Sequence, residues 1–130
     1  MIDVSWYKDN HRIILWEMKG VWTLAEYNRA ADITRDLMAE VEHPVDVIGD
    51  LRETNFMPPN IVMTVAARYR EIDSRDSNYG ISVLIDANRV IETIAALLDR
   101  MPYTKNRFYF APDFATAEAL IKQYRNCADN

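Results

Sequence analysis

The segment from Val45 to Arg52 is the part of this 130-residue chain that most limits its fold. It reads Val-Asp-Val-Ile-Gly-Asp-Leu-Arg, an apolar run that ends in polar residues. Two prolines in the following loop then lead to Asn60, where a helix-periodic stretch begins. A strand that feeds a helix across a loop is the basic unit of α/β proteins, which place binding sites at the carboxyl ends of such strands. The segment therefore predicts an α/β fold with a functional edge beyond residue 51.

The rest of the chain alternates between strand-like and helix-like patterns. Residues 2–6 alternate apolar and polar side chains, and an apolar run at 13–21 follows a polar turn, so an N-terminal β-hairpin is expected. Thr23 and Glu26 form a capping box at the first predicted helix, which Pro44 ends. The predicted helices cover residues 23–43, 60–73, 88–101 and 113–124. Asp86 or Asn88 caps the third of these helices and Pro102 closes it, and Asp113 caps the fourth. The other predicted strands cover residues 45–51, 79–85 and 108–111.

This order of elements predicts one domain over residues 1–130. Strands that alternate with helices of about 12 residues form a mainly parallel sheet, and the opening hairpin adds one antiparallel edge. We expect a mixed sheet of about five strands with four helices. The apolar fraction of 49% is sufficient for a core without disulfides or metal.

Charge and composition exclude several classes of partner. The net charge of −5 and the pI of about 5.0 argue against nucleic acid and anionic membranes. Neither a bilayer-spanning apolar run nor a signal peptide is recognisable, and the single cysteine, Cys127, fits a reducing compartment, so a cytoplasmic protein is expected. The densest basic group, formed by Arg68, Arg70 and Arg75, is interpreted as a solvated helix face.

No residue pattern in the chain predicts catalysis. Glycine-rich phosphate loops, a nucleophile elbow and Ser-His-Asp or Cys-His sets are not recognisable. His11 and His43 have no second histidine or cysteine at metal-ligand spacing. We therefore expect no enzyme, no catalytic residues, no metal and no cofactor.

The element order, together with Val-Ile-Gly-Asp-Leu-Arg ahead of a loop and a helix start, resembles the STAS domain of bacterial anti-sigma-factor antagonists, which is also attached to some anion transporters. In that family Asp-Leu is followed, after a spacer, by Asp-Ser-Ser/Thr-Gly at the helix start, where a partner kinase phosphorylates the serine. Asp50-Leu51 match the motif, whereas Pro58-Pro59-Asn60-Ile61 stand at the helix start. Proline cannot accept phosphate, so the resemblance implies a divergent stand-alone member without the phosphorylation switch.

Polar residues near the end of the strand are the predicted binding site. They are Asp50, Arg52, Glu53, Thr54, Asn55 and Asn60. With the family resemblance they suggest a regulatory module that binds a protein partner. A purely local role is the alternative: Asp50 would accept backbone N–H bonds and pair with Arg52, and Asn60 would serve as an N-cap. The free N–H groups after Asn60 could instead bind an anion.

A small-molecule or lipid carrier is the second functional hypothesis. Phe56, Met57, Met63 and Met101 could line an apolar pocket, because methionine adapts to varied ligand shapes. Trp6, Trp16 and Trp22 lie in or beside the hairpin, where they pack in the core and at the sheet edge or form an exposed patch for a homodimer.

Overall fold

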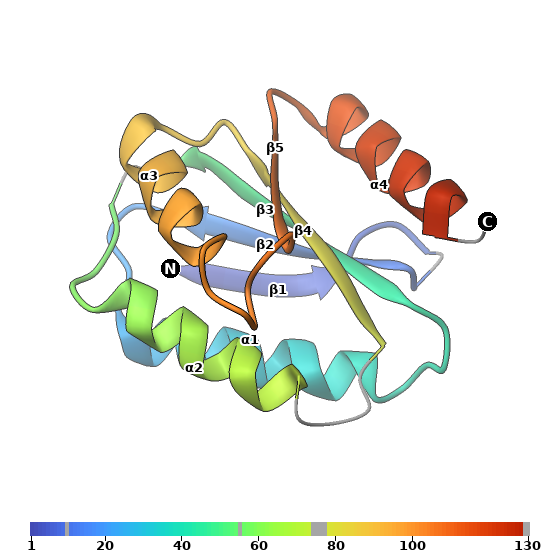
Figure 1. Ribbon diagram of the computed structural model, residues 1–130, viewed down its shortest axis with the longest axis horizontal. Helices are drawn as coiled ribbons and strands as arrows, with labels where there is room; N and C mark the ends of the chain where they lie inside the picture. The colour runs from blue at the N-terminus through green and yellow to red at the C-terminus, as the bar shows by residue number, and fades with distance from the viewer. Residues whose placement is uncertain (10, 55, 74–77, 129–130) are drawn as a thin grey trace.

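The computed structural model describes residues 1–9, 11–54, 56–73 and 78–128. It confirms the predicted α/β fold with its four helices and mixed five-stranded sheet (Figure 1). The elements are β1 (Ile2–Trp6), β2 (Ile13–Lys19), α1 (Leu24–Met38), β3 (Val45–Glu53), α2 (Ile61–Asp73), β4 (Tyr79–Ile85), α3 (Arg89–Leu98), β5 (Phe108–Ala111) and α4 (Phe114–Ala128).

The strands lie in the sheet in the order in which they occur along the chain. β1 pairs antiparallel with β2, with Ile2 opposite Met18. The β2–β3, β3–β4 and β4–β5 pairs are parallel, so the carboxyl ends of β2 to β5 lie at one edge of the sheet. β3 is the central strand, and it extends to Glu53. Arg52 and Glu53 therefore belong to the strand and not to the loop expected after residue 51.

Helices cover both faces of the sheet. On one face, Tyr27 of α1, Val65 of α2 and Ile91 of α3 belong to a single core cluster. On the other face, Ala117 and Ile121 of α4 pack with strand residues such as Val83. Figure 1 shows α4 apart from the other three helices. The period of two along a strand thus decides which side chains face α1–α3 and which face α4.

The caps of three helices are found at the predicted residues. Thr23 Oγ1 accepts a hydrogen bond from Glu26 N at 3.1 Å. Asn88 caps α3 through its bond from Ile91 N, and the Asp113 carboxylate accepts from Thr116 N at 2.7 Å. Such caps satisfy N–H groups that the first helical turn leaves without a partner.

Two helices end earlier than predicted. α1 ends at Met38, not near His43, because the Asn78 side-chain amide lies within 2.8–3.3 Å of the carbonyl oxygens of Met38, Val41 and His43 and holds the connecting loop outside the helix. α3 ends at Leu98, not Met101, because the buried Thr104 hydroxyl donates to the Leu98 carbonyl. In each case a side chain donates to a carbonyl oxygen that would accept a backbone N–H if the helix continued.

A buried ion pair ties α4 to the sheet. Asp46 of β3 is 2% exposed, and its carboxylate accepts from Arg125 Nε at 2.9 Å and from the backbone N–H of Ile81 at 2.9 Å. A Cβ atom at Gly80 would collide with both charged side chains. Only a glycine at position 80 therefore leaves room for these two side chains to approach the backbone so closely.

None of the helices in the described part of the chain combines the length and the apolar character needed to cross a bilayer.

Candidate functional site

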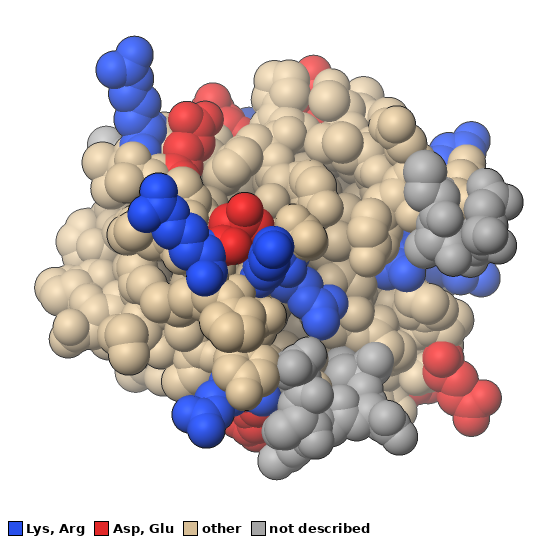
Figure 2. Space-filling model, viewed as in Figure 1, with Lys and Arg blue, Asp and Glu red and all other residues tan. Residues whose placement is uncertain are grey.

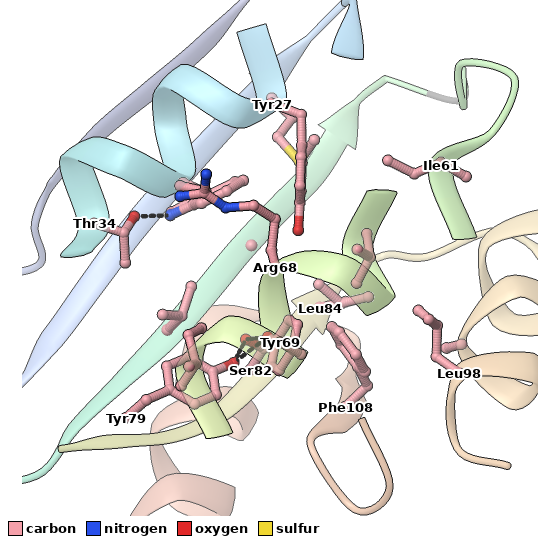
Figure 3. Close-up of a pocket in the computed structure, with 18 of the residues that line it drawn as sticks. Tyr27, Thr34, Ile61, Arg68, Tyr69, Tyr79, Ser82, Leu84, Leu98 and Phe108 are labelled. Atoms are coloured by element: carbon pink, nitrogen blue, oxygen red, sulfur yellow. Dashed lines mark hydrogen bonds between the residues drawn. The ribbon is translucent and has the colours of Figure 1, made fainter. Parts of the chain in front are cut away.

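A cavity of about 290 Å³ lies between the sheet and the layer formed by α1, α2 and α3 (Figure 3). Its sheet wall is built from alternate strand residues, Val47, Gly49 and Leu51 of β3 with Ser82 and Leu84 of β4. Alternation places these side chains on the face away from α4. Gly49 keeps this wall open, because a Cβ atom there would lie 2.9 Å from Leu84 Cδ2.

The helix wall of the cavity is mostly apolar. Each of the three helices contributes side chains from its inward stripe, for example Met38 of α1, Val65 of α2 and Leu98 of α3. Aromatic rings add to it, and Trp16 and Tyr27 pack edge to face with 5.5 Å between ring centroids. A concave apolar space with a few polar groups is the usual form of a small-molecule site.

Tyr27 of α1 directs a polar group into this space. The residue is 9% exposed, and Figure 3 shows its hydroxyl pointing into the cavity. Burial raises the pKa of this hydroxyl, and the neighbouring Tyr69 raises it further. The Arg68 cation lowers it. No described residue forms a hydrogen bond with it. The hydroxyl is therefore a protonated donor without a protein acceptor in the described chain.

Two ion pairs connect α1 and α2 beside the cavity. Arg68 Nη2 donates to the Asp32 carboxylate at 2.7 Å, and Arg35 lies 3.9 Å from Glu71. Arg68, Arg35 and Glu71 line the cavity. The Arg35 and Glu71 side chains are about half exposed, so the cavity reaches the surface between these helices.

The arginine group was expected to be a solvated helix face, and this is wrong for Arg68. Its side chain is only 21% exposed and lines the cavity. Arg70 is exposed near the Tyr103 ring, and Arg75 lies outside the described residues. Helical periodicity alone could not separate Arg68 from Arg70, because the arginine stem is long enough to cover apolar surface beside a buried stripe.

A cluster of three hydroxyl groups lies on the cavity wall near the start of β4. The Tyr79 hydroxyl bonds to those of Tyr69 and Ser82, and Tyr69 lies 3.3 Å from Ser82 (Figure 3). Burial raises the pKa of both tyrosines. These hydroxyl groups satisfy one another, unlike the Tyr27 hydroxyl.

The tryptophans of the hairpin region have different roles. Trp16 Nε1 donates to Thr34 Oγ1 at 2.8 Å, which fixes the indole on the cavity wall. Trp22 is 1% exposed, and its buried Nε1 has no acceptor among the described residues. Trp6 stacks on His11 at 4.7 Å, away from the cavity.

Of the predicted binding residues, Asp50 and Arg52 are brought together. Arg52 donates to both Asp50 carboxylate oxygens at 2.9 Å, and the pKa of Asp50 is lowered by this bond. The guanidinium lies 5.1 Å from the centre of the Phe114 ring of α4. This pair therefore lies on the α4 face, and the sheet separates it from the cavity.

Of the other predicted binding residues, Glu53 ends β3, Thr54 follows it, and Asn60 directly precedes α2. Glu53 lies 3.7 Å from Lys19, and the Thr54 hydroxyl donates to the Gly20 carbonyl at 2.5 Å. Asn55 lies outside the described residues. Asn60 precedes α2 and has a φ of 68°. Its backbone carbonyl, not its side chain, accepts a hydrogen bond from Thr64 N. Within the described part of the chain, no side-chain cap from Asn60 is found, so its predicted N-cap role is wrong.

Of the four residues predicted to line an apolar pocket, only Met57 lines the cavity. Met63 is 67% exposed on α2, Met101 packs against the neighbouring core, and Phe56 lies outside the lining. The residues that the sequence analysis missed are Tyr27 and Arg68. The signal for Tyr27 was its position on the inward stripe of α1, where tyrosine brings a hydroxyl into an otherwise apolar layer.

The surface over α2 and α3 carries both signs of charge. Figure 2 shows basic and acidic side chains interspersed there, with a broad area of other residues between them.

A comparison of the chain with models of known protein families and with curated proteins found no match.

Proposed function

We propose that the protein binds a small, largely apolar molecule in the cavity under α1, α2 and α3. The observation that carries this proposal is the 290 Å³ cavity itself, walled by apolar side chains from the sheet and three helices. Small-molecule sites in proteins are concave, mostly apolar spaces with a small number of polar groups. A space of this size with an apolar lining is therefore better explained by ligand binding than by ordinary packing.

The cavity volume limits the ligand to a small molecule. At roughly 30 Å³ for each non-hydrogen atom, taken from the volume of a water molecule in the liquid, the cavity holds about ten such atoms. A medium-chain or single-ring compound fits within this volume, whereas a whole phospholipid would extend out of it. The function we propose is thus that of a carrier or sensor of such a molecule, without chemistry performed on it.

Native mass spectrometry of the protein purified from its own cells tests this proposal. We expect a bound species that organic extraction releases, and we expect Ala31→Phe to abolish it, because Ala31 lines the cavity from α1. Ala25→Phe is the matched control, since Ala25 lies on the exposed face of the same helix. A clean apo mass together with no thermal stabilisation of the wild-type protein by 1-octanol contradicts the proposal.

A protein-binding function at the β3 edge, as in STAS-type regulatory modules, is the second candidate. One observation favours it: the Arg52 guanidinium is 54% exposed yet held by Asp50 and the Phe114 ring. A cation held in one orientation loses little entropy when it meets an acidic partner. In pull-downs from native cells, Arg52→Ala should lose partners that Arg89→Ala, which changes an exposed arginine on α3, retains. Identical partner sets for both variants contradict this candidate.

A further inference from the structure

We infer that Tyr27 and Arg68 together bind the carboxylate of an apolar acid whose body fills the cavity. The inference rests on the proposed function and specifies its ligand class. It depends on two donors from different helices that reach the same space, one of them charged. Hydrogen bonds from such groups to a carboxylate are stronger than those between neutral groups.

The Tyr27 hydroxyl supplies the first donor. The Tyr27 residue is 9% exposed, and its hydroxyl points into the cavity and has no acceptor among the described residues. Placing a hydroxyl in an apolar environment without a hydrogen bond is unfavourable, so phenylalanine would be preferred there on packing grounds alone. A ligand oxygen satisfies this group. Since burial raises the pKa of Tyr27, the hydroxyl remains a proton donor at neutral pH.

The Arg68 guanidinium supplies the second donor and the positive charge. Arginine has five N–H groups on three nitrogens, and the described residues accept from only one of these nitrogens, Nη2, through Asp32. Both side chains line the cavity, and the Arg68 charge opposes the rise that burial causes in the pKa of Tyr27. A carboxylate between these two side chains can therefore accept from both.

The acidic groups near Arg68 are more exposed to solvent than Arg68 itself. The Asp32 and Glu71 side chains are 48% and 40% exposed, whereas that of Arg68 is 21% exposed. Glu71 also lies close to a second cation, Arg35. Because solvent screens exposed charges more strongly than buried ones, the Arg68 charge is screened less than those of the two carboxylates. The pKa of Asp32 is lowered by Arg68, so both partners are charged at neutral pH.

The remaining space accommodates the apolar body of the acid. About ten non-hydrogen atoms correspond to octanoate or to a phenyl-substituted short acid. Both share the chemistry of a carboxylate on an apolar body, and they differ in flexibility. Octanoate and 3-phenylpropanoate therefore distinguish an aliphatic from an aromatic ligand without changing the head group.

Isothermal titration of the full chain with octanoate, 1-octanol and octylamine tests the inference. These probes keep the apolar chain and change only the head group. We expect octanoate to bind at least ten-fold more tightly than 1-octanol, and octylamine to bind most weakly, because hydrogen bonds to charged groups are the stronger ones.

Three variants identify the residues involved. Arg68→Met should weaken octanoate binding about ten-fold while changing 1-octanol binding less than about two-fold. Tyr27→Phe removes a donor to either oxygen, so it should weaken the binding of both probes, octanoate more than 1-octanol. Asp32→Asn removes the competing carboxylate but keeps Arg68, so octanoate binding should become about two-fold tighter or more. Circular dichroism and thermal unfolding of each variant establish that it is folded before titration.

The outcomes separate this inference from the proposed function. If 1-octanol and octanoate bind equally and Arg68→Met affects neither, the cavity binds ligands but the carboxylate site is refuted. If octylamine binds most tightly, the head group has the opposite charge and the inference is wrong. If no probe binds the wild-type protein and Ala31→Phe changes nothing, the proposed function fails together with the inference.

Discussion

Asp46 and Arg125 show how a single charged pair can hold a helix against a sheet. Asp46 is almost fully buried, and Arg125 reaches it from the last turn of α4 with two hydrogen bonds. Breaking a buried pair leaves an unpaired charge in a poorly solvated place, which is much more costly than losing a surface pair. The attachment of α4 should therefore depend on this contact.

Arg125→Met is expected to lower the free energy of unfolding by about 3 kcal/mol, because it leaves the Asp46 carboxylate without its cation. The control is Lys8→Met, which removes the exposed Lys8–Glu118 pair and should have a much smaller effect. Urea unfolding followed by circular dichroism measures both. Equal effects of the two substitutions would contradict the role of the buried pair.

Asp50 gives the protein a predictable response to acid. Its pKa in the folded state is lowered, mainly by the Arg52 hydrogen bond, relative to the unfolded value near 3.9. The unfolded state therefore binds the proton more readily, so the pair stabilises the fold above about pH 4 and this contribution is lost as the pH falls through the folded value.

Arg52→Met should reduce the loss of unfolding free energy between about pH 6 and about pH 3, because the main cause of the Asp50 shift is gone. Arg89→Met on α3 serves as the control, and it should retain the wild-type loss over the same range. Urea titrations at several pH values provide the measurement. An unchanged pH dependence in Arg52→Met would show that Asp50 is not the group responsible.

At the scale of helices and strands, the sequence was sufficient for the order of elements and for most of their starts. Thr23, Asn88 and Asp113 cap helices through bonds to nearby backbone N–H groups, so local sequence contains the information. The ends of α1 and α3 could not be predicted in the same way. They depend on Asn78, which is distant from α1 in the chain, and on the buried Thr104.

Asn78→Asp tests the explanation for the end of α1. The carboxylate cannot donate to the three loop carbonyls that the amide now approaches, so the free energy of unfolding should fall by about 2 kcal/mol. Asn28→Asp on α1 makes the same chemical change in a half-exposed position and should have little effect. Urea unfolding compares the two, and similar stabilities would rule out the proposed role of Asn78.

At the scale of the whole molecule, the candidate site illustrates what a sequence pattern leaves undetermined. The edge at Asp50 and Arg52 was predictable, because the carboxyl end of a central strand is defined by the order of elements. The cavity was not, since an inward apolar stripe looks the same whether its side chains meet or leave space. Its existence depends on how Gly49, Leu84 and the helices fit together in three dimensions.

The position of the cavity also separates two potential functions within one small fold. Ligands in the cavity contact α1, α2 and α3, whereas a partner at Arg52 contacts the α4 face. β3 is common to both, with Leu51 on the cavity wall and Arg52 next to it facing α4. Substitutions at Arg52 and at Arg68 should therefore affect different ligands.

Methionine methyl NMR provides the most direct test of the central claim that the cavity is a binding site. Met18, Met38 and Met57 line it, whereas Met1 and Met63 are 49% and 67% exposed elsewhere. With ¹³C-methyl labelling, saturating octanoate should shift the resonances of the three lining methionines and produce intermolecular nuclear Overhauser effects to them, leaving Met1 and Met63 unchanged. Shifts confined to Met1 and Met63, or no shifts at saturation, would contradict the account.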